Sequence, residues 1–145
     1  MKKIGVSACL LGHNVRYDGT SKKNEELLKL LEGQEVIAIC PEVAGGFSVP
    51  HDPCEIALDK VISSNNDDVT AIFVKGAEAS LKIIEGCDFV VLKSKSPSCG
   101  YGKIYDGSFS GKLVDGNGIF ARLCLEHKIK IFTEEDLDDI NSSIQ

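Results

Sequence analysis

The sequence predicts a single α/β domain over residues 1–145, Rossmann-like, with a mostly parallel sheet and helices on both faces. Short apolar segments typical of buried strands alternate along the chain with segments of helical periodicity. Parallel strands are joined by helical crossovers, so this alternation favours helices on both faces of one sheet. The length of 145 residues is typical of one domain, and no internal repeat, linker or low-complexity tract divides the chain.

The first half of the chain predicts three strands and one helix. Lys3–Ala8 is short, apolar and partly β-branched, which is typical of a buried strand, and Glu35–Ile39 repeats this pattern. Between them, Asn24–Leu31 carries four leucines and ends near a glycine, as a helix does. Val43–Pro53 is expected to be a loop because paired glycines and two prolines interrupt it. A short strand is expected over Asp59–Ser63.

The second half predicts two further strands and three helices. A helix is expected over Val69–Glu85, capped by Asp67 or Asp68, because its apolar residues fall at helical spacing. Asp88–Leu92 is the clearest buried strand, and a polar, glycine-rich segment over residues 93–118 follows it. The remaining elements are, in order, a helix over Gly118–His127, a strand over Lys130–Phe132 and an acidic helix that begins at Thr133 through a Thr-x-x-Asp capping pattern.

Composition and charge exclude several functional classes. The 16 basic and 22 acidic residues give a net charge of −6, whereas a nucleic-acid-binding protein normally carries a basic stripe. A hydrophobic content of 43% argues against intrinsic disorder. No apolar run approaches the roughly 18 residues of a membrane helix. Only five residues separate Lys3 from Cys9, which is short for a secretion signal. We therefore expect a cytoplasmic protein that binds neither nucleic acid nor membrane; the sequence leaves its oligomeric state open.

Six cysteines in a reducing compartment indicate metal binding or catalysis more than a disulfide framework. Three of them follow predicted strands: Cys9, Cys40 and Cys99. The carboxyl ends of parallel strands meet at one edge of a sheet, where such folds bind their ligands, so we expect these thiols at a common site. Cys87 and Cys124 are expected to pack as small apolar side chains, whereas Cys54 lies in the proline-bounded loop near the site.

Three thiolates without an obvious fourth ligand leave two kinds of metal site open. A zinc ion can be held by three thiolates and keep an open position for water. A [4Fe-4S] cluster is the other choice, since thiolates are its usual ligands and its fourth iron would remain free to bind another molecule. Soft sulfur ligands suit the cluster, and no histidine lies nearby in the sequence, so the residues favour iron–sulfur over zinc.

Polar residues beside two of these cysteines are candidates for acid–base chemistry. Glu42 follows Cys40 by two residues and can act as a general base or as a carboxylate that caps a loop amide. Ser98 precedes Cys99 and can position a substrate or a water, although turn hydroxyls more often bond to their own backbone. The acidic run over residues 134–139 is interpreted as the solvated face of the last helix. Most other polar loop residues are expected to be solvated or to stabilise turns: Arg16, Asp18, Glu55, Glu78, Lys93, Lys95 and Asp106.

The motifs around these residues resemble a known bacterial family, the TudS-like 2-thiouracil desulfidases, formerly a domain of unknown function. The resemblance runs from about Lys3 to Leu137. It rests on a Ser-Ala-Cys-Leu-Leu-Gly element, a Cys-Pro-Glu element and a Ser-Pro-Ser-Cys-Gly element in that order. Further matching segments lie at residues 76–78, 104–107 and 109–111.

The resemblance implies a [4Fe-4S] cluster held by three cysteines, which map onto Cys9, Cys40 and Cys99. It implies that the open iron binds the thiocarbonyl sulfur of a small thiolated pyrimidine such as 2-thiouracil and acts as a Lewis acid. Water then attacks the ring carbon, and hydrosulfide is released without net electron transfer. Glu42 and Ser98 match the positions expected for water activation and for substrate or proton handling, and Asp18 is a weaker candidate.

Two residues depart from the family pattern. His51 stands where relatives more often carry arginine, and Cys54 stands where a small residue is usual. Both lie in the loop after Cys40, so the resemblance leaves the identity of the substrate open. Two other functions also remain open. One is a non-catalytic metal- or cluster-carrying module that binds a small molecule, and the other is a metal-free Rossmann-like protein that binds a small anion at its glycine turns.

Overall fold

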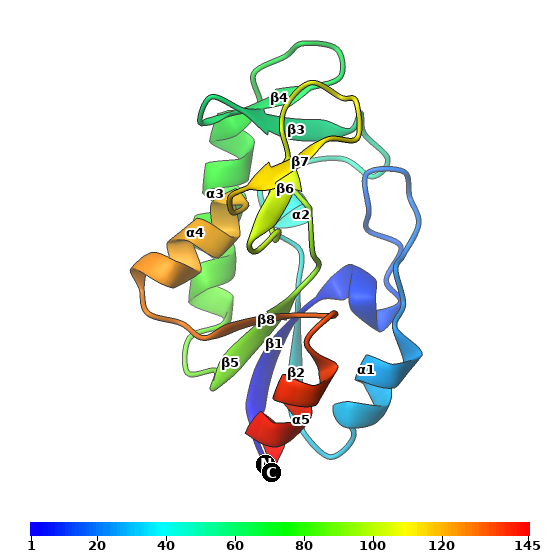
Figure 1. Ribbon diagram of the computed structural model, residues 1–145, viewed down its shortest axis with the longest axis vertical. Helices are drawn as coiled ribbons and strands as arrows, with labels where there is room; N and C mark the ends of the chain where they lie inside the picture. Colours follow the sequence, from blue (N-terminus) through cyan, green and yellow to red (C-terminus); the bar gives the residue numbers. More distant parts are fainter.

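In the computed structural model, which describes residues 1–145, a four-stranded parallel sheet forms the centre of the molecule. Every strand pairs in parallel with its neighbour. The strand order is β2 (Glu35–Ile39), β1 (Lys3–Ser7), β5 (Phe89–Leu92) and β8 (Ile131–Thr133). The predicted α/β class is confirmed, and the four strands end toward the same side of the molecule (Figure 1).

Both faces of the sheet are buried, because alternate side chains of each strand point to opposite sides. In β5, Val90 and Leu92 belong to one apolar cluster, whereas Phe89 and Val91 belong to another. All four side chains are almost fully shielded from solvent. A sheet buried on both faces needs a layer of helices on each side.

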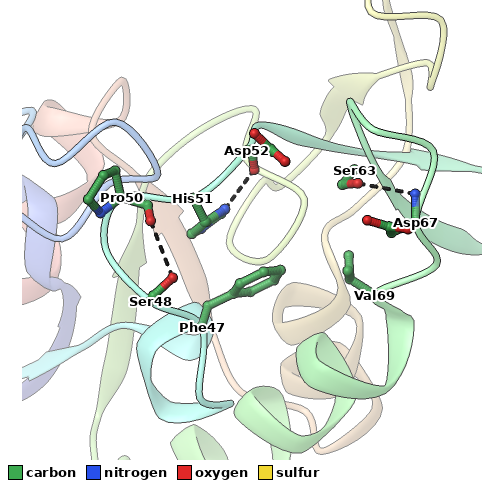
Figure 2. Close-up of a pocket in the computed structure, with 8 residues that line it drawn as sticks. All are labelled: Phe47, Ser48, Pro50, His51, Asp52, Ser63, Asp67 and Val69. Atoms are coloured by element: carbon green, nitrogen blue, oxygen red, sulfur yellow. Dashed lines mark hydrogen bonds between the residues drawn. The ribbon is translucent and has the colours of Figure 1, made fainter.

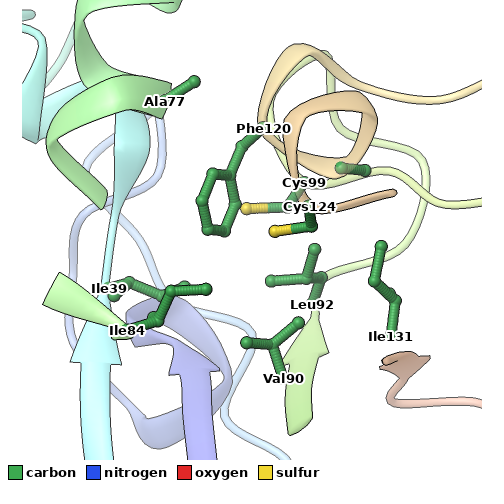
Figure 3. Packing of buried hydrophobic residues seen from close by; sticks show 10 residues of the cluster. Ile39, Ala77, Ile84, Val90, Leu92, Cys99, Phe120, Cys124 and Ile131 are labelled. Carbon is green, nitrogen blue, oxygen red and sulfur yellow. The ribbon is translucent and has the colours of Figure 1, made fainter. Parts of the chain in front are cut away.

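Four helices supply these two layers. Residues of α3 and α4 complete the cluster around Val90 and Leu92, where Phe120 and Cys124 pack over the strand (Figure 3). Residues of α1 and α5 complete the cluster on the opposite face. The four helices are α1 (Glu25–Leu30), α3 (Thr70–Ile83), α4 (Ile119–Glu126) and α5 (Leu137–Ile144). None of the helices is long and apolar enough to span a membrane.

Two antiparallel hairpins lie beyond the carboxyl ends of the parallel strands (Figure 1). One is formed by β3 (Cys54–Ala57) and β4 (Lys60–Ser63), and the other by β6 (Lys103–Tyr105) and β7 (Leu113–Asp115). Of these four strands, only β4 was expected from the sequence. The segment over residues 93–118 is therefore not continuous loop, because it contains the second hairpin.

A short helix, α2 (Pro41–Ala44), directly follows β2 and packs closely on α3. The expectation that the loop begins at Val43 is therefore wrong by two residues. Glycines on both sides permit the close approach. A Cβ at Gly76 in α3 would overlap the carbonyl oxygen of Pro41, and one at Gly45 would overlap the carbonyl oxygen of Ile72. This contact fixes α2, and with it Glu42, against the body of the protein.

Two predicted helix starts differ from the structure. α3 begins at Thr70, and its N-cap residue, Val69, has no side chain that can cap it. Asp68, one residue earlier, accepts hydrogen bonds from the backbone N–H and the hydroxyl of Thr70, the first residue of the helix. Thr133 is the last residue of β8, and α5 begins four residues later at Leu137. The Thr-x-x-Asp pattern does form its bond, since the backbone N–H of Thr133 donates to Asp136 at 2.8 Å. It closes a turn between strand and helix rather than opening the helix.

Candidate active site

The three cysteines that follow strands of the parallel sheet line one cavity of about 600 Å³. Cys9 lies in a single turn of 3₁₀ helix, η1 (Ala8–Leu11), directly after β1. Cys40 is the residue between β2 and α2. Cys99 lies in the loop after β5, where its backbone N–H donates to the Ser96 hydroxyl at 2.7 Å. The fold thus brings together three thiols that are far apart in the sequence.

Burial raises the pKa of each of these thiols. It is the main reason for the raised pKa of Cys99, and negative charge on Cys9 or Cys40 would raise that pKa further. Burial also raises the pKa of Cys40, and it raises that of Cys9 to about 11. Three neighbouring thiolates in this environment need a positive group to stabilise them, which a metal centre provides when it displaces the protons.

The donor chemistry of this cavity fits an iron–sulfur core. Cys9, Cys40 and Cys99 are free and line the same cavity. Thiolates are the usual ligands of iron–sulfur clusters, and each corner iron of such a core takes its own thiolate. Three thiols can therefore hold three corners of a four-iron core and leave the fourth open.

Glu42 and Ser98 meet beside these thiols. Ser98 Oγ donates to Glu42 Oε2 at 2.9 Å and lies 3.8 Å from Cys99 Sγ. The Ser96 hydroxyl is 3.2 Å from Ser98 Oγ and extends the chain of hydrogen bonds. Both side chains line the cavity, and they bond to each other rather than to the backbone of their own loops. This arrangement leaves a carboxylate and a hydroxyl facing the space beside the thiols.

His51, which received no role from the sequence, holds the second oxygen of this carboxylate. Its Nε2 lies 3.0 Å from Glu42 Oε1, and its Nδ1 lies 2.6 Å from the carbonyl oxygen of Asp52. Burial lowers the pKa of His51, but the hydrogen bonds and charges of Glu42 and Asp52 outweigh burial and raise the pKa overall. A protonated imidazole donates to both acceptors at once.

The ring of Phe47 keeps this histidine in place. The two rings stack with centroids 4.1 Å apart, and the edge of Phe47 also contacts Phe73. Phe47 and His51 line a second pocket of about 510 Å³, which Figure 2 shows. His51 also lines the cavity that contains the thiols, so it lies between the two pockets. The backbone N–H of His51 donates to the carbonyl oxygen of Tyr17 at 2.7 Å. Packing and hydrogen bonds together leave the imidazole one orientation, toward Glu42.

A partly buried ion pair lies just beyond the ends of the neighbouring strands β5 and β8. Lys93 Nζ is 3.0 Å from Glu134 Oε2, and their side chains are only 20% and 14% exposed. Burial raises the pKa of Glu134, but hydrogen bonds from Ser94 and the charge of Lys93 outweigh it and hold the pKa below its usual range. The expectation that Glu134 belongs to a solvated helix face is therefore wrong. The positive charge of Lys93 also lies near Cys9, where it partly offsets the rise in the thiol pKa that burial causes.

The remaining sequence candidates have varied surroundings. Asp18 is not part of the cavity wall; it accepts a hydrogen bond from Thr20 and lies 3.7 Å from Arg16. Cys54 lines the cavity beside Glu42, and burial raises its pKa to about 12. Cys124 is in the apolar core, and Cys87 packs half-buried against the same cluster. Four residues that were expected to be solvated or in turns also line the cavity: Arg16, Glu55, Lys93 and Lys95.

Comparisons with known proteins agree with the resemblance seen in the motifs. Residues 4–136 match the model of a protein family described as 2-thiouracil desulfurase. The chain is 36% identical over 149 residues to the uncharacterized protein YbbK of Bacillus subtilis strain 168, covering 94% of this chain and 99% of that one. A solved structure of TudS, described as a [4Fe-4S]-dependent thiouracil desulfidase, superposes with a TM-score of 0.92 at 42% identity. That alignment covers 99% of this chain and 98% of the other.

Proposed function

Because this chain belongs to the 2-thiouracil desulfurase family, we propose that it is a [4Fe-4S]-dependent desulfidase of a small thiolated pyrimidine such as 2-thiouracil. The observation that carries this proposal is the cavity lined by Cys9, Cys40 and Cys99, each of which follows a different strand of the sheet. A hydrogen-bonded carboxylate and hydroxyl lie beside these thiols in the same cavity. The reaction converts a thiocarbonyl and one water into a carbonyl, a hydrosulfide ion and a proton. It is a hydrolysis, so neither substrate nor protein gains or loses electrons.

Cys9, Cys40 and Cys99 are the residues that would hold the cluster. Each follows a different strand of the parallel sheet, and each would supply one thiolate to the cluster. When bound, a cluster with one iron free of protein ligands supplies a Lewis acid that polarises the carbon–sulfur bond of the substrate. Lys93 contributes positive charge near Cys9, which favours the thiolate form that binding requires.

Glu42 is the general base of this proposal. A carboxylate has about four acceptor sites, and Ser98 and His51 occupy one on each oxygen, so sites remain to accept a proton from water. The two fixed hydrogen bonds hold the carboxylate in one orientation as water attacks the ring carbon. Ser98 stands between Glu42 and Cys99, and this position allows it to pass the proton toward the departing sulfur.

The test is an assay of anaerobically reconstituted protein with 2-thiouracil, in which uracil and sulfide are both quantified. We expect the two products in equal amounts, and we expect the Glu42→Gln variant to keep its cluster but lose most of the rate. A loaded protein that binds 2-thiouracil and releases no sulfide contradicts the proposal and favours a non-catalytic cluster-carrying module. Sulfide release that persists unchanged in Glu42→Gln would instead remove Glu42 from the mechanism.

A further inference from the structure

The loop between β6 and β7, residues 106–112, contains an aromatic residue in an unusual backbone conformation. Phe109 has a φ of +57°, which lies in the left-handed region that bulky residues rarely adopt. Its side chain does not gain a place in the apolar core in return, because the residue is 39% exposed. Strained backbone of this kind persists only where surrounding contacts impose it, and it concentrates at functional sites.

Glu55 provides those contacts from the other hairpin. One of its carboxylate oxygens, Oε1, accepts hydrogen bonds from the backbone N–H of Gly107 at 3.0 Å and from that of Phe109 at 3.1 Å. The loop also lies directly on β3, since a Cβ at Gly107 would come within 2.5 Å of the Ala57 side chain. A carboxylate on one hairpin therefore fixes the backbone on both sides of residue 108 in the other.

Phe109 and Glu55 both line the cavity that contains the three thiols. The thiols come from the strand ends of the sheet, whereas the loop arches through the layer of hairpins beyond those ends (Figure 1). A molecule that reaches the thiols therefore has this loop on the wall formed by the hairpins. Flat heteroaromatic rings bind well against aromatic side chains, because the stacked contact buries a large area at little entropic cost.

From this geometry we infer that Phe109 is a substrate-binding residue that stacks on the pyrimidine ring, and that Glu55 is the positioning residue that presents it. The inference rests on the proposed function and names the cavity wall that recognises the ring. It explains why an aromatic side chain is held partly exposed in a strained conformation. It also assigns the Glu55 carboxylate, which points to backbone amides, a role separate from that of the general base.

The test compares Michaelis parameters of the holoenzyme for 2-thiouracil in three variants at Phe109. Loss of a base–aromatic stack costs about tenfold or more in affinity, so Phe109→Gly is expected to raise KM about tenfold while kcat stays within about twofold. Phe109→Leu keeps an apolar side chain without the ring and is expected to raise KM as well. Phe109→Tyr keeps the ring, so its KM should stay close to the wild-type value. The dissociation constant of uracil, measured by calorimetry on the same proteins, should rise in parallel with KM.

Two matched controls separate stacking from general effects on the hairpins. Tyr101 is also 39% exposed but does not line the cavity, so Tyr101→Ala should leave KM unchanged. Leu58 is a fully exposed residue with a φ of +48°, so Leu58→Gly relieves the same kind of strain without touching the site. For Glu55, the Gln variant keeps an acceptor oxygen and should retain KM, whereas Glu55→Ala should raise it in the same direction as Phe109→Gly.

Unchanged KM and uracil affinity in both Phe109→Gly and Phe109→Leu would overturn the inference and leave the proposed function standing. A fall in kcat alone, with KM unaffected, would also overturn it, since stacking acts on binding. Failure of the wild-type holoenzyme to release sulfide would remove the proposed function and this inference with it. The two failures are thus distinguished by the wild-type assay.

Discussion

The parallel sheet with its four helices and the layer of two hairpins beyond it are built differently. In the sheet, every residue of β5 and β8 is buried, whereas every residue of β7 in the hairpin layer is exposed. The sheet is held by apolar clusters on both faces, and the hairpin layer by a smaller cluster around Phe73 and by hydrogen bonds such as those of Glu55. The cavity lies where the two meet, with thiols from one side and Phe109 from the other.

The parallel sheet and the hairpin layer are therefore suited to two different tasks. A cluster needs its ligands at fixed positions, and the proposed ligands Cys9, Cys40 and Cys99 all follow strands of the buried sheet. A substrate wall can be built from a more exposed layer whose loops vary without disturbing the core. The comparison predicts that substitutions on the sheet side remove the cofactor or unfold the protein, whereas those on the hairpin side change substrate affinity.

Removal of any one of the thiols of Cys9, Cys40 and Cys99 should have the largest effect. We expect Cys9→Ser, Cys40→Ser and Cys99→Ser each to lose the cluster and all desulfidase activity. Each variant leaves only two thiolates, which are too few to hold a core that already has one iron without a protein ligand. Iron content and visible absorption after anaerobic reconstitution provide the measurement. Cys54→Ser, in the same cavity, and Cys87→Ser, outside it, should both keep the iron. Loss of iron in Cys54→Ser would place a fourth ligand in the hairpin layer, so that the sheet side alone would not hold the cluster.

Glu42 lies at the junction of the two regions and should give the next largest effect. Glu42→Gln preserves the shape of the side chain but removes the proposed general base, so kcat should fall by about 10²–10⁴-fold with the iron content unchanged. His51→Gln keeps only one of the two hydrogen bonds made by the imidazole, and we expect a smaller decrease in kcat for that variant. Steady-state kinetics on cluster-normalised protein measures both. A larger loss in His51→Gln than in Glu42→Gln would assign the base differently.

The close contact between α2 and α3 predicts a loss of stability. Gly76→Ala places a methyl group against the carbonyl oxygen of Pro41, and this overpacking should cost about 1–3 kcal/mol in the free energy of unfolding. Urea denaturation measures the change. Ala121→Gly is the control, because it changes the free energy of unfolding through a different helix, α4, on the same face of the sheet. Gly102→Ala is unsuitable, because the positive φ of Gly102 would itself cause strain. Gly76→Ala with wild-type stability would show that α2 can shift freely.

The Lys93–Glu134 pair predicts the smallest effect, a pH-dependent contribution to stability. Because the pKa of Glu134 is lowered in the folded protein, its contribution is fully present above its ordinary value of 4.5 and is lost as the pH falls through the lowered pKa. Glu134→Gln should therefore cost about 1–2 kcal/mol at pH 7, and the difference from wild type should shrink as the pH falls below 4.5. Denaturation curves at several pH values test this, with exposed Glu135→Gln as the control. A difference that grows toward acid pH would contradict the assigned direction.

The sheet could be predicted from the sequence because each buried strand is a short apolar segment that can be recognised from neighbouring residues alone. Glu35–Ile39 was predicted with the bounds that β2 has, and Asp88–Leu92 differs from β5 by one residue. The hairpins lacked such signals. Strands β6 and β7 are three residues long, and six of the seven residues that join them are polar or glycine. The tight turn at Leu58 and Asp59 is left-handed at both residues without a glycine.

The site shows the same division. Cys9, Cys40 and Cys99 were grouped by their place after strands, which is a property of the sheet, and Glu42 and Ser98 were found through them. His51 escaped because its contact with Glu42 depends on the path of the loop after α2, and no spacing rule predicts that path. Glu134 was misread as part of an acidic face, although a signal existed. Lys93 and Glu134 each follow the last residue of two strands that lie side by side, in register at Leu92 and Thr133.

The metal and sulfide content of the anaerobically reconstituted wild-type protein decides the identity of the metal centre. We expect about four irons and four inorganic sulfides per chain, with no zinc, because three cysteine thiolates and one open corner suit a [4Fe-4S] core. One zinc per chain without inorganic sulfide, or iron that binds equally well after Cys99→Ser, would rule out this cluster.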